Sequence, residues 1–407
     1  MASNTIVVVG TGQAGGWTAR TLRDEGYEGR IVVVGEEPFP PYERPPLSKE
    51  LLFGDMPVEK TYVFPQAMYA DKNIELRLGI RAVAVDAKAH TVMLAGGETI
   101  AYDKLMLATG SRPRPLPVPG TELASVFMLR TIADTESIRH AIQPGENVAV
   151  VGGGWIGLEI AAGAKKLGAK VTVVEALDRL CARAVTPDLS AFLKAAHEAQ
   201  GVDIRLNAAV TRIEGRDRAE AVVLADGTRV PATVIVIGIG IVPNVELAAE
   251  AGLAIDNGIV VDDHGQTSDP DVYAAGDVAN QPNGILGRRI RLESWENAQN
   301  QAIAAAKSML GKGAPFAEIP WFWSDQFDLN IQLVGLPVVW DQAVTRGSVD
   351  ARQFITFYLK EGRIEGAAAI NSARDVRFVR RLMAAGKPLD AARLADPAVK
   401  LQDLLKG

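Results

Sequence analysis

Runs of consecutive apolar residues, each followed by glycines, recur along the chain and predict buried strands. Thr5–Val9 leads into a glycine loop, a helical stretch and a second apolar run at Ile31–Val34. Asn147–Val151 leads into the same succession, with its second run at Lys170–Val174. Strands of a parallel sheet are buried on both faces and therefore read as continuous apolar runs. The pattern predicts two units in which a helix connects two parallel strands.

Each half then continues with a hairpin and a further apolar run, and closes with a proline. The hairpin turns are predicted at Gly96-Gly97 and at Asp226-Gly227, dipeptides that favour tight turns between strands. The closing residues Pro113 and Pro243 lie 130 residues apart, as do Gly97 and Gly227. A constant offset between matching elements indicates two copies of one dinucleotide-binding fold.

The glycine loops carry the first chemistry. In such a loop the first glycine makes a tight turn, the second lets the backbone approach a pyrophosphate, and the third allows close packing of helix and strand. Each loop is followed, 26 or 23 residues after its first glycine, by a carboxylate suited to binding ribose hydroxyls. These predicted cofactor residues are Gly10, Gly12, Gly15 and Glu36 in the first half, and Gly152, Gly154, Gly157 and Glu175 in the second.

The carboxylate of the second half also bears on cofactor choice. Glu175 suits the free 2′-hydroxyl of NADH and repels the 2′-phosphate of NADPH. Arg179 and Arg183 follow closely and could weaken this discrimination. The sequence therefore favours NADH.

Charge and cysteine content exclude several classes of protein. The net charge of −6 argues against a nucleic-acid-binding protein, since phosphate recognition needs basic surface. No apolar run approaches the roughly 20 residues that cross a bilayer, and a cytoplasmic location is expected. The single cysteine excludes an internal disulfide, and the four histidines show no ligand spacing, so no metal site is expected. Redox chemistry would depend on a bound cofactor.

With both loops placed, the chain resembles the flavoprotein family with two dinucleotide-binding domains that includes glutathione reductase. Within it, the chain more closely resembles the NADH-dependent ferredoxin reductases of bacterial oxygenase systems, such as biphenyl dioxygenase ferredoxin reductase and putidaredoxin reductase. The resemblance spans the whole chain. It rests on these segments: Arg44-Pro45-Pro46-Leu47-Ser48-Lys49, Ala108-Thr109-Gly110, Leu129-Arg130-Thr131, the FAD signature Thr267 to Asp277, Glu293-Ser294-Trp295, and Trp321 to Gln326.

The resemblance implies an α/β fold with two Rossmann-like domains and a smaller α+β C-terminal domain. The FAD domain is expected at residues 1–113 and 244–319, the NADH domain at 114–243 and the C-terminal domain at 320–407. In the last domain we expect strands at Phe354–Leu359 and Ile364–Ile370 and a helix at Arg374–Ala385.

The resemblance also implies roles for single residues. Lys49 and Glu159 are expected beside the reacting atoms, where a pair would orient the nicotinamide and offset the charge of reduced flavin. Asp277 is expected to hold the ribityl chain. Further cofactor contacts are expected from Arg44, Thr109, Gly110, Arg130, Gly240, Gly276, Glu293 and Trp295.

The segment Tyr42 to Lys49 decides between branches of the family. Disulfide reductases carry a cysteine pair there, and peroxidase or oxidase relatives a single cysteine, but this chain has none. Flavin accepts a hydride and releases electrons singly, and the resemblance implies a [2Fe–2S] ferredoxin as acceptor. A monomer or a homodimer is expected. The alternatives are a rubredoxin reductase, a flavin NADH oxidase, or an NADH-sensing flavoprotein similar to apoptosis-inducing factor.

Overall fold

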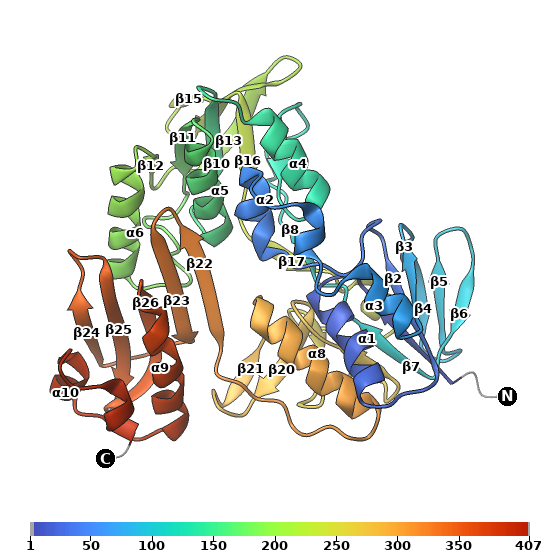
Figure 1. Ribbon diagram of the computed structural model, residues 1–407. Coiled ribbons are helices and arrows are strands. Elements are labelled where there is room, and N and C mark those ends of the chain that lie inside the picture. The colour runs from blue at the N-terminus through green and yellow to red at the C-terminus, as the bar shows by residue number, and fades with distance from the viewer. Residues whose placement is uncertain (1–3, 406–407) are drawn as a thin grey trace. The chain divides into compact units, whose positions relative to one another are not determined.

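A computed structural model describes residues 4–405 of the chain, whose contacts group into two compact units (Figure 1). The chain passes between the units four times, so neither unit is one continuous segment. Unit 1 consists of Met1–Tyr42, Tyr62–Gly110 and Pro243–Gly407, and unit 2 of Glu43–Thr61 and Ser111–Val242. The division into three domains expected from the sequence stays a prediction.

Unit 1 contains a parallel five-stranded sheet in which residues distant in sequence lie side by side. The apolar runs predicted as strands form β1, β2 and β7, and β19 joins them from far along the chain. The strand order is β19 (Val272–Ala274), β7 (Lys104–Leu107), β1 (Thr5–Val9), β2 (Arg30–Gly35) and β3 (Ile74–Leu78).

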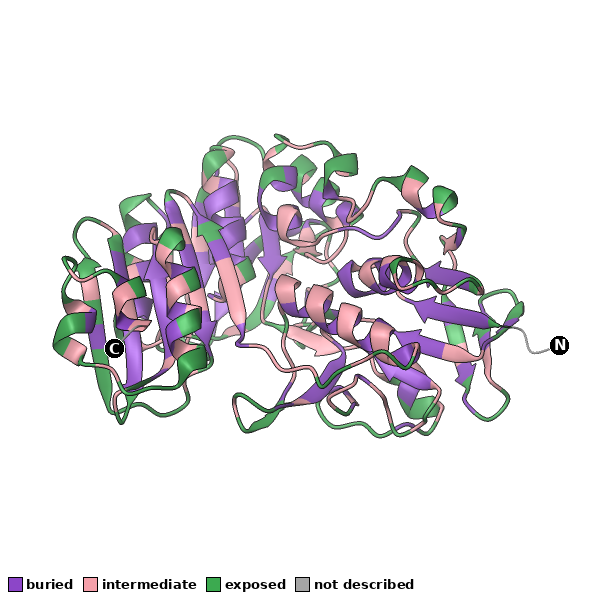
Figure 2. Cartoon of the chain, turned by 60° about the horizontal axis from the view of Figure 1, so that its bottom comes forward, coloured by how far each residue is buried: buried purple, intermediate pink, exposed green. Residues whose placement is uncertain are grey.

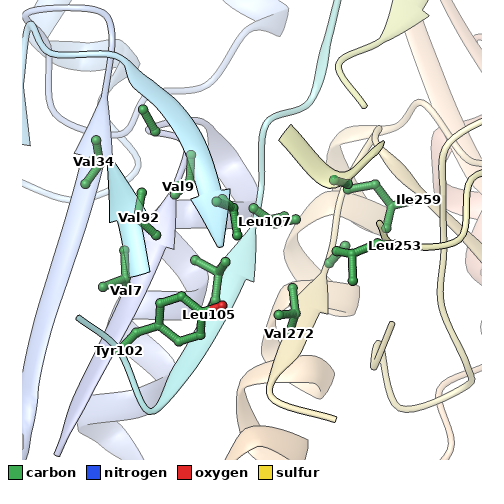
Figure 3. Close-up of a cluster of buried hydrophobic side chains, with 14 of the residues drawn as sticks. Val7, Val9, Val34, Val92, Tyr102, Leu105, Leu107, Leu253, Ile259 and Val272 are labelled. Carbon is green, nitrogen blue, oxygen red and sulfur yellow. The ribbon is translucent and has the colours of Figure 1, made fainter. Parts of the chain in front are cut away.

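Successive side chains of a strand point to opposite faces of the sheet, and in this sheet both faces are buried. On one face Val7 and Val9 pack with residues of an antiparallel sheet, β4 (Ala82–Asp86), β5 (Thr91–Leu94) and β6 (Thr99–Ala101) (Figure 3). On the other face Ile6 and Val8 pack with helices α1 (Gln13–Asp24) and α8 (Trp295–Met309). Burial on both faces explains why the apolar run of β1 is unbroken.

Unit 2 repeats this plan. Its parallel sheet is lined on one face by an antiparallel sheet, with Val151, Val222 and Ile235 in the shared core. The parallel strands are β12 (Asp203–Arg205), β11 (Lys170–Val174), β10 (Asn147–Val151), β16 (Val234–Ile237) and β9 (Val126–Met128). The antiparallel strands are β13 (Val210–Gly215), β14 (Ala219–Leu224) and β15 (Arg229–Pro231). Helices α5 (Trp155–Lys166) and α6 (Pro187–Ala199) belong to the same unit.

The two predicted hairpin turns are confirmed. Gly97 and Gly227 both have positive φ, and each donates its N–H to the carbonyl three residues earlier. The strands that flank the turns, β5 with β6 and β14 with β15, are antiparallel.

The C-terminal part of unit 1 is an antiparallel sheet covered by a helix. The predicted strands and helix of this part correspond to β25, β26 and α9, whose bounds extend the predictions by at most one residue at either end. The strand order is β22 (Trp321–Gln326), β23 (Leu329–Gly335), β26 (Arg363–Ile370), β25 (Gln353–Lys360) and β24 (Gln342–Ser348), with α9 at Ala373–Ala385. Val376, Val379 and Leu382 of α9 pack into the core of this sheet.

The remaining elements are short. Figure 2 shows buried residues concentrated in the strands and exposed residues in the loops and on the outer faces of helices. The other helices are η1 (Pro45–Ser48), α2 (Glu50–Phe53), η2 (Val58–Thr61), α3 (Gln66–Asp71), α4 (Ile132–Ala141), α7 (Glu246–Glu250), α10 (Ala391–Ala395) and η3 (Leu401–Leu405). The other strands are β8 (Ser111–Pro113), β17 (Ile241–Pro243), β18 (Ile259–Val260), β20 (Ala279–Asn283) and β21 (Arg288–Ile290).

Candidate cofactor sites

The first glycine loop joins β1 to α1, and its three glycines meet three different surroundings. Gly10 has a φ of +123°, and a Cβ there would lie 2.1 Å from the Ala108 carbonyl oxygen. A Cβ on Gly15 would lie 1.9 Å from the Gly10 carbonyl oxygen, so only glycine lets α1 begin this close to β1. A Cβ on Gly12 would meet no described atom within 4 Å beyond its chain neighbours. Gly12 therefore borders open space.

The second loop, between β10 and α5, has the same geometry. Gly152 has a φ of +113°, with a Cβ position 2.4 Å from the Gly238 carbonyl oxygen. A Cβ on Gly157 would lie 2.1 Å from the Gly152 carbonyl oxygen, and one on Gly154 would again meet no described atom within 4 Å beyond its neighbours. The roles predicted for the three glycines thus match the space around each one in both loops.

Both loops end at the N-terminus of a helix suited to an anion. Gly12 is the N-cap of α1 and Gly154 the N-cap of α5, and in the described chain neither helix has a side-chain cap. The first turns hold no acidic residue in either helix. The backbone N–H groups of a helix's first turn and the helix dipole favour a phosphate beside the open second glycine.

The carboxylate of the second loop is held beside the glycines. Glu175 follows β11 directly, and its carboxylate accepts hydrogen bonds from the N–H of Gly153 at 2.6 Å and of Leu177 at 2.8 Å. A carboxylate has about four acceptor positions, so two backbone donors leave capacity for ribose hydroxyls. The position fits the predicted role.

The carboxylate of the first loop lies one residue farther on. Strand register aligns Val9 with Val34 and Val151 with Val174, so the counterpart of Glu175 is Gly35 rather than Glu36. A Cβ on Gly35 would lie 2.2 Å from the side chain of Thr11. Glu36 has a side chain 68% exposed and lies 3.7 Å from Arg81.

Lys49 and Glu159 form a buried ion pair within unit 2. The Lys49 Nζ lies 3.0 Å from the Glu159 Oε1, and the side chains are only 9% and 2% exposed. The Ser48 hydroxyl donates to the other carboxylate oxygen of Glu159. The predicted pairing of these residues is observed, and Ser48 is a third member that sequence reasoning missed although it lies within the Arg44 to Lys49 motif.

Two further predicted residues also meet in unit 2. The guanidinium of Arg44 donates to the backbone carbonyl of Arg130. Thr131 caps α4 reciprocally with Asp134, which also accepts from the Arg130 N–H at 3.0 Å. The Leu129 to Thr131 motif therefore has a structural function as a helix cap beside any contact with a cofactor.

The FAD signature lies against the first helix. A Cβ on Gly276, where φ is +83°, would lie 3.1 Å from the Cβ of Ala14 in α1. The side chains of Thr109 and Asn244 exchange hydrogen bonds with each other's backbone carbonyls at 2.7 and 2.9 Å, and Asn244 donates its own N–H to the Gly110 carbonyl. Segments far apart in sequence thus gather around the first loop.

Buried polar atoms without a partner fit a bound group in unit 1. The Oε1 of Gln13, the first residue of α1, and the indole Nε1 of Trp295 are buried without a hydrogen-bond partner among the described residues. Buried polar groups are nearly always hydrogen-bonded, so these two atoms fit a bound ligand that would complete them. Trp295 also packs edge-on against Trp323, which stacks on Trp321 at 5.1 Å. Glu293 pairs with Arg291 at 2.7 Å.

The two arginines and the cysteine near the second loop have different surroundings. Arg179 donates to the carbonyls of Val185 and Ala182, whereas Arg183 is exposed, with Nη2 3.5 Å from a Cβ position on Gly240. Burial raises the pKa of the Cys181 thiol, and the carboxylates of Glu175 and Glu159 raise it further. Arg179 therefore supports its own loop.

The predicted residues divide between the units. Those of the first glycine loop and the FAD signature lie in unit 1, and those of the second loop lie in unit 2 with Arg44, Lys49 and Arg130. Within residues 4–405, no cluster of three or more His, Cys, Asp or Glu residues is placed to bind a metal. Over the same residues, every helix is too short or too polar to cross a membrane.

Two glycine loops with open second glycines, each at a helix N-terminus, are typical of oxidoreductases with two dinucleotide-binding loops. The chain belongs to the pyridine nucleotide-disulphide oxidoreductase family, which matches residues 4–302, and residues 321–405 match the reductase C-terminal family.

Relatives of known activity match along the whole chain. The ferredoxin–NAD(+) reductase component of the anthranilate 1,2-dioxygenase system of Burkholderia cepacia is 42% identical, covering 100% of both chains. That of the biphenyl dioxygenase system of Paraburkholderia xenovorans is 39% identical over 99% of this chain and 98% of its own. The structure of putidaredoxin reductase in covalent complex with putidaredoxin has a TM-score of 0.96 at 38% identity, covering 100% and 99% of the two chains. The resemblance noted from the sequence motifs is confirmed.

Proposed function

We propose that this chain is an NADH-dependent ferredoxin reductase that serves an oxygenase. It would hold FAD at the first glycine loop and NADH at the second, and deliver electrons to a [2Fe–2S] ferredoxin that feeds a Rieske-type oxygenase or a cytochrome P450. We further propose that it acts in the cytoplasm, as a monomer or a homodimer. The observation that carries the proposal is the matched geometry of the two glycine loops, together with relatives named as ferredoxin–NAD(+) reductases.

Lys49 and Glu159 are proposed to act beside the reacting rings. When bound, the flavin accepts a hydride from the nicotinamide and can release the electrons one at a time. The Glu159 carboxylate, which also accepts from Ser48, fixes the Lys49 ammonium in one position. A buried cation held in place in this way favours negative charge nearby without having to reorient.

The second loop favours NADH over NADPH. Glu175 is fixed by two backbone N–H groups, so its charge stays in the ribose position and repels a 2′-phosphate. Arg179, a residue that could have reduced this repulsion, is held by carbonyls of its own loop. Arg183 is the arginine positioned to weaken the preference.

The position of the single cysteine favours a one-electron carrier as the electron acceptor. The chain has one cysteine, and Cys181 is buried beside the second glycine loop with Sγ 3.6 Å from the Gly153 carbonyl. Its raised pKa keeps the thiol protonated, and a thiolate is the reactive form. Cys181 is therefore unsuited to relay electrons, and they would leave directly to a partner protein.

The exposed face of α9 is proposed to bind the acidic surface of the ferredoxin. Arg374, Arg377 and Arg381 are exposed at helical spacing, whereas Arg380 pairs with Glu296 at 2.8 Å. If Arg377→Glu with Arg381→Glu leaves the rate of ferredoxin reduction and its salt dependence unchanged, this assignment is wrong.

The test of the main proposal is an anaerobic titration of the purified flavoprotein with NADH, followed by mixing with candidate acceptors. We expect bleaching of the flavin by one NADH and then reduction of two equivalents of [2Fe–2S] ferredoxin. Faster turnover with oxygen alone would identify an NADH oxidase, and selective reduction of rubredoxin a rubredoxin reductase. A long-lived charge-transfer complex that reduces neither carrier would identify an NADH sensor.

A further inference from the structure

The backbone of Gly276 and Asp277 is bound from two sides by side chains. The N–H of Gly276 donates to the Oε1 of Gln301 at 2.8 Å. The carbonyl of Asp277 accepts from the guanidinium of Arg291 at 3.0 Å. Two neighbouring residues, one with a positive φ of 83°, are therefore held by partners from α8 and from the segment that follows β21.

Gln301 belongs to a buried network that fixes its side chain. It is 1% exposed, and its Nε2 donates to the Oε1 of Gln281 at 2.8 Å. The Nδ2 of Asn297, one turn earlier in α8, lies 3.4 Å from the Gln301 Oε1. Because both ends of the Gln301 amide are bound, its orientation toward Gly276 is set.

Arg291 joins segments that are far apart in sequence. Its side chain is only 10% exposed, and its guanidinium pairs with Glu293 at 2.7 Å. The Nε lies 3.4 Å from the Oδ1 of Asn257, and a Cβ on Gly258 would lie 2.8 Å from the Arg291 Cδ. The turn at Asn257, the FAD signature and Glu293 thus meet at one buried cation.

The segments held by these two side chains are those that face the predicted cofactor. Gly276 lies against Ala14, beside Gln13, whose buried Oε1 has no partner among the described residues. Trp295, whose buried indole N–H also lacks a partner in the described chain, follows Glu293 by two residues. Gln301 and Arg291 therefore secure the backbone next to the atoms that a ligand would complete.

We propose that Arg291 and Gln301 are positioning residues that aim Asp277 at the bound FAD. The inference rests on the proposed function, because Asp277 is assigned to the ribityl chain by its motif. Arg291 also supplies a largely buried positive charge that pairs with the carboxylate of Glu293. Without it, a positive charge is lost near the proposed flavin site, which disfavours reduction to an anionic form.

The variants are Arg291→Met and Gln301→Met, each with a matched control from the same region. Arg289→Met removes a guanidinium that bonds the carbonyls of Val261 and Asn280 instead. Asn300→Leu, at the neighbouring position of α8, removes an amide that bonds Glu318 instead of Gly276. The measurements are the Kd for FAD on reconstitution of the apoprotein, thermal stability, and the flavin midpoint potential against reference dyes.

We expect both test variants to bind FAD about 10- to 100-fold more weakly than wild type, since a hydrogen bond to or from a charged or buried group is lost. The midpoint potential of Arg291→Met should fall, and both controls should stay near wild type. Arg291→Lys, which keeps the charge but not the planar fork, should retain the potential while weakening FAD binding. This variant decides the question if Arg291→Met does not fold.

The outcomes separate the inference from the proposed function. Wild-type protein that does not bind FAD would overturn the function itself. Wild-type protein that binds FAD, with Kd and potential unchanged in Arg291→Lys, Arg291→Met and Gln301→Met relative to their controls, would overturn only the positioning role.

Discussion

The two glycine loops have the same backbone geometry, but the positions of a larger and a smaller residue are exchanged between them. In the first loop Thr11 fills the space beside Gly35, and in the second Glu175 fills the space beside Gly153. Strand register makes Gly35 and Glu175 equivalent. The phosphate-binding backbone geometry is therefore common to both loops, whereas the residue available to a ribose differs between them.

This comparison shows which part of a dinucleotide site is fixed by the fold. The first and third glycines are required by contacts within the protein, because a Cβ at any of these four positions would lie 1.9 to 2.4 Å from a backbone oxygen. The second glycine borders open space, and the Glu175 carboxylate keeps acceptor capacity beyond its two backbone donors, so the identity of both residues depends on the ligand. The predictions below test this division.

The largest effect is expected for Gly152→Ala. The new Cβ would lie 2.4 Å from a backbone oxygen at a positive φ, so we expect a loss of about 3 kcal/mol in the free energy of unfolding, together with loss of NADH binding. Gly154→Ala is the matched control, because its Cβ meets open space. It should keep its melting temperature but bind NADH more weakly. Equal destabilisation of both variants would contradict the division.

The buried ion pair gives the next largest effect. Lys49→Met removes the cation from the buried Glu159 carboxylate, which still accepts from Ser48, and removing one partner of a buried pair costs about 3–5 kcal/mol. Denaturant unfolding should show this loss. Stopped-flow reduction of the flavin by NADH should be slowed, and an unchanged rate would remove Lys49 from the mechanism.

Substitution of the two carboxylates, Glu175 and Glu36, compares the ribose-binding positions of the two loops directly. Glu175→Ala should raise the KM for NADH about 10-fold, consistent with loss of a hydrogen bond to a charged group, and should reduce the preference over NADPH. Glu36→Ala should change FAD retention much less, because this side chain is exposed and out of register. A larger effect at Glu36 than at Glu175 would reverse the interpretation.

The smallest effect is expected for the thiol. Because the folded-state pKa of Cys181 is raised, the protonated thiol contributes stability below its unfolded pKa of about 8.5, and this contribution is lost as the pH rises above that value. At pH 8 a thiol reagent should label native protein far more slowly than denatured protein. Cys181→Ser should retain ferredoxin reduction, and its loss would indicate a role for sulfur.

Much of the fold was predictable because local signals agree with one another. The apolar runs of β1 and β10, the glycine loops and the two hairpin turns appear where the sequence places them. The edge strands β9 and β19 were not predicted as members of the parallel sheets. Each is three residues long and is recruited by pairing with a distant strand, which no local pattern reports.

Sequence motifs pointed to the candidate sites. They did not predict the strand register at the carboxylates or the side chains that hold the backbone of the site in place. Glu36 is the first carboxylate after the second apolar run, and only strand pairing shows that Gly35 holds the position equivalent to Glu175. Arg291 and Gln301 were missed because their contacts with Gly276, Asp277 and Asn257 span 14 to 34 residues of the chain. Such contacts depend on tertiary packing and leave no spacing to recognise.

The strand β19 has a consequence for synthesis on the ribosome. The second parallel sheet has all its strands once Ile237 has been translated, although its first strand begins after residue 125. The first sheet must wait for Val272–Ala274 before its edge is covered. The half of the protein that is made first is therefore the one completed last, and its nascent edge is open to incorrect pairing for longer.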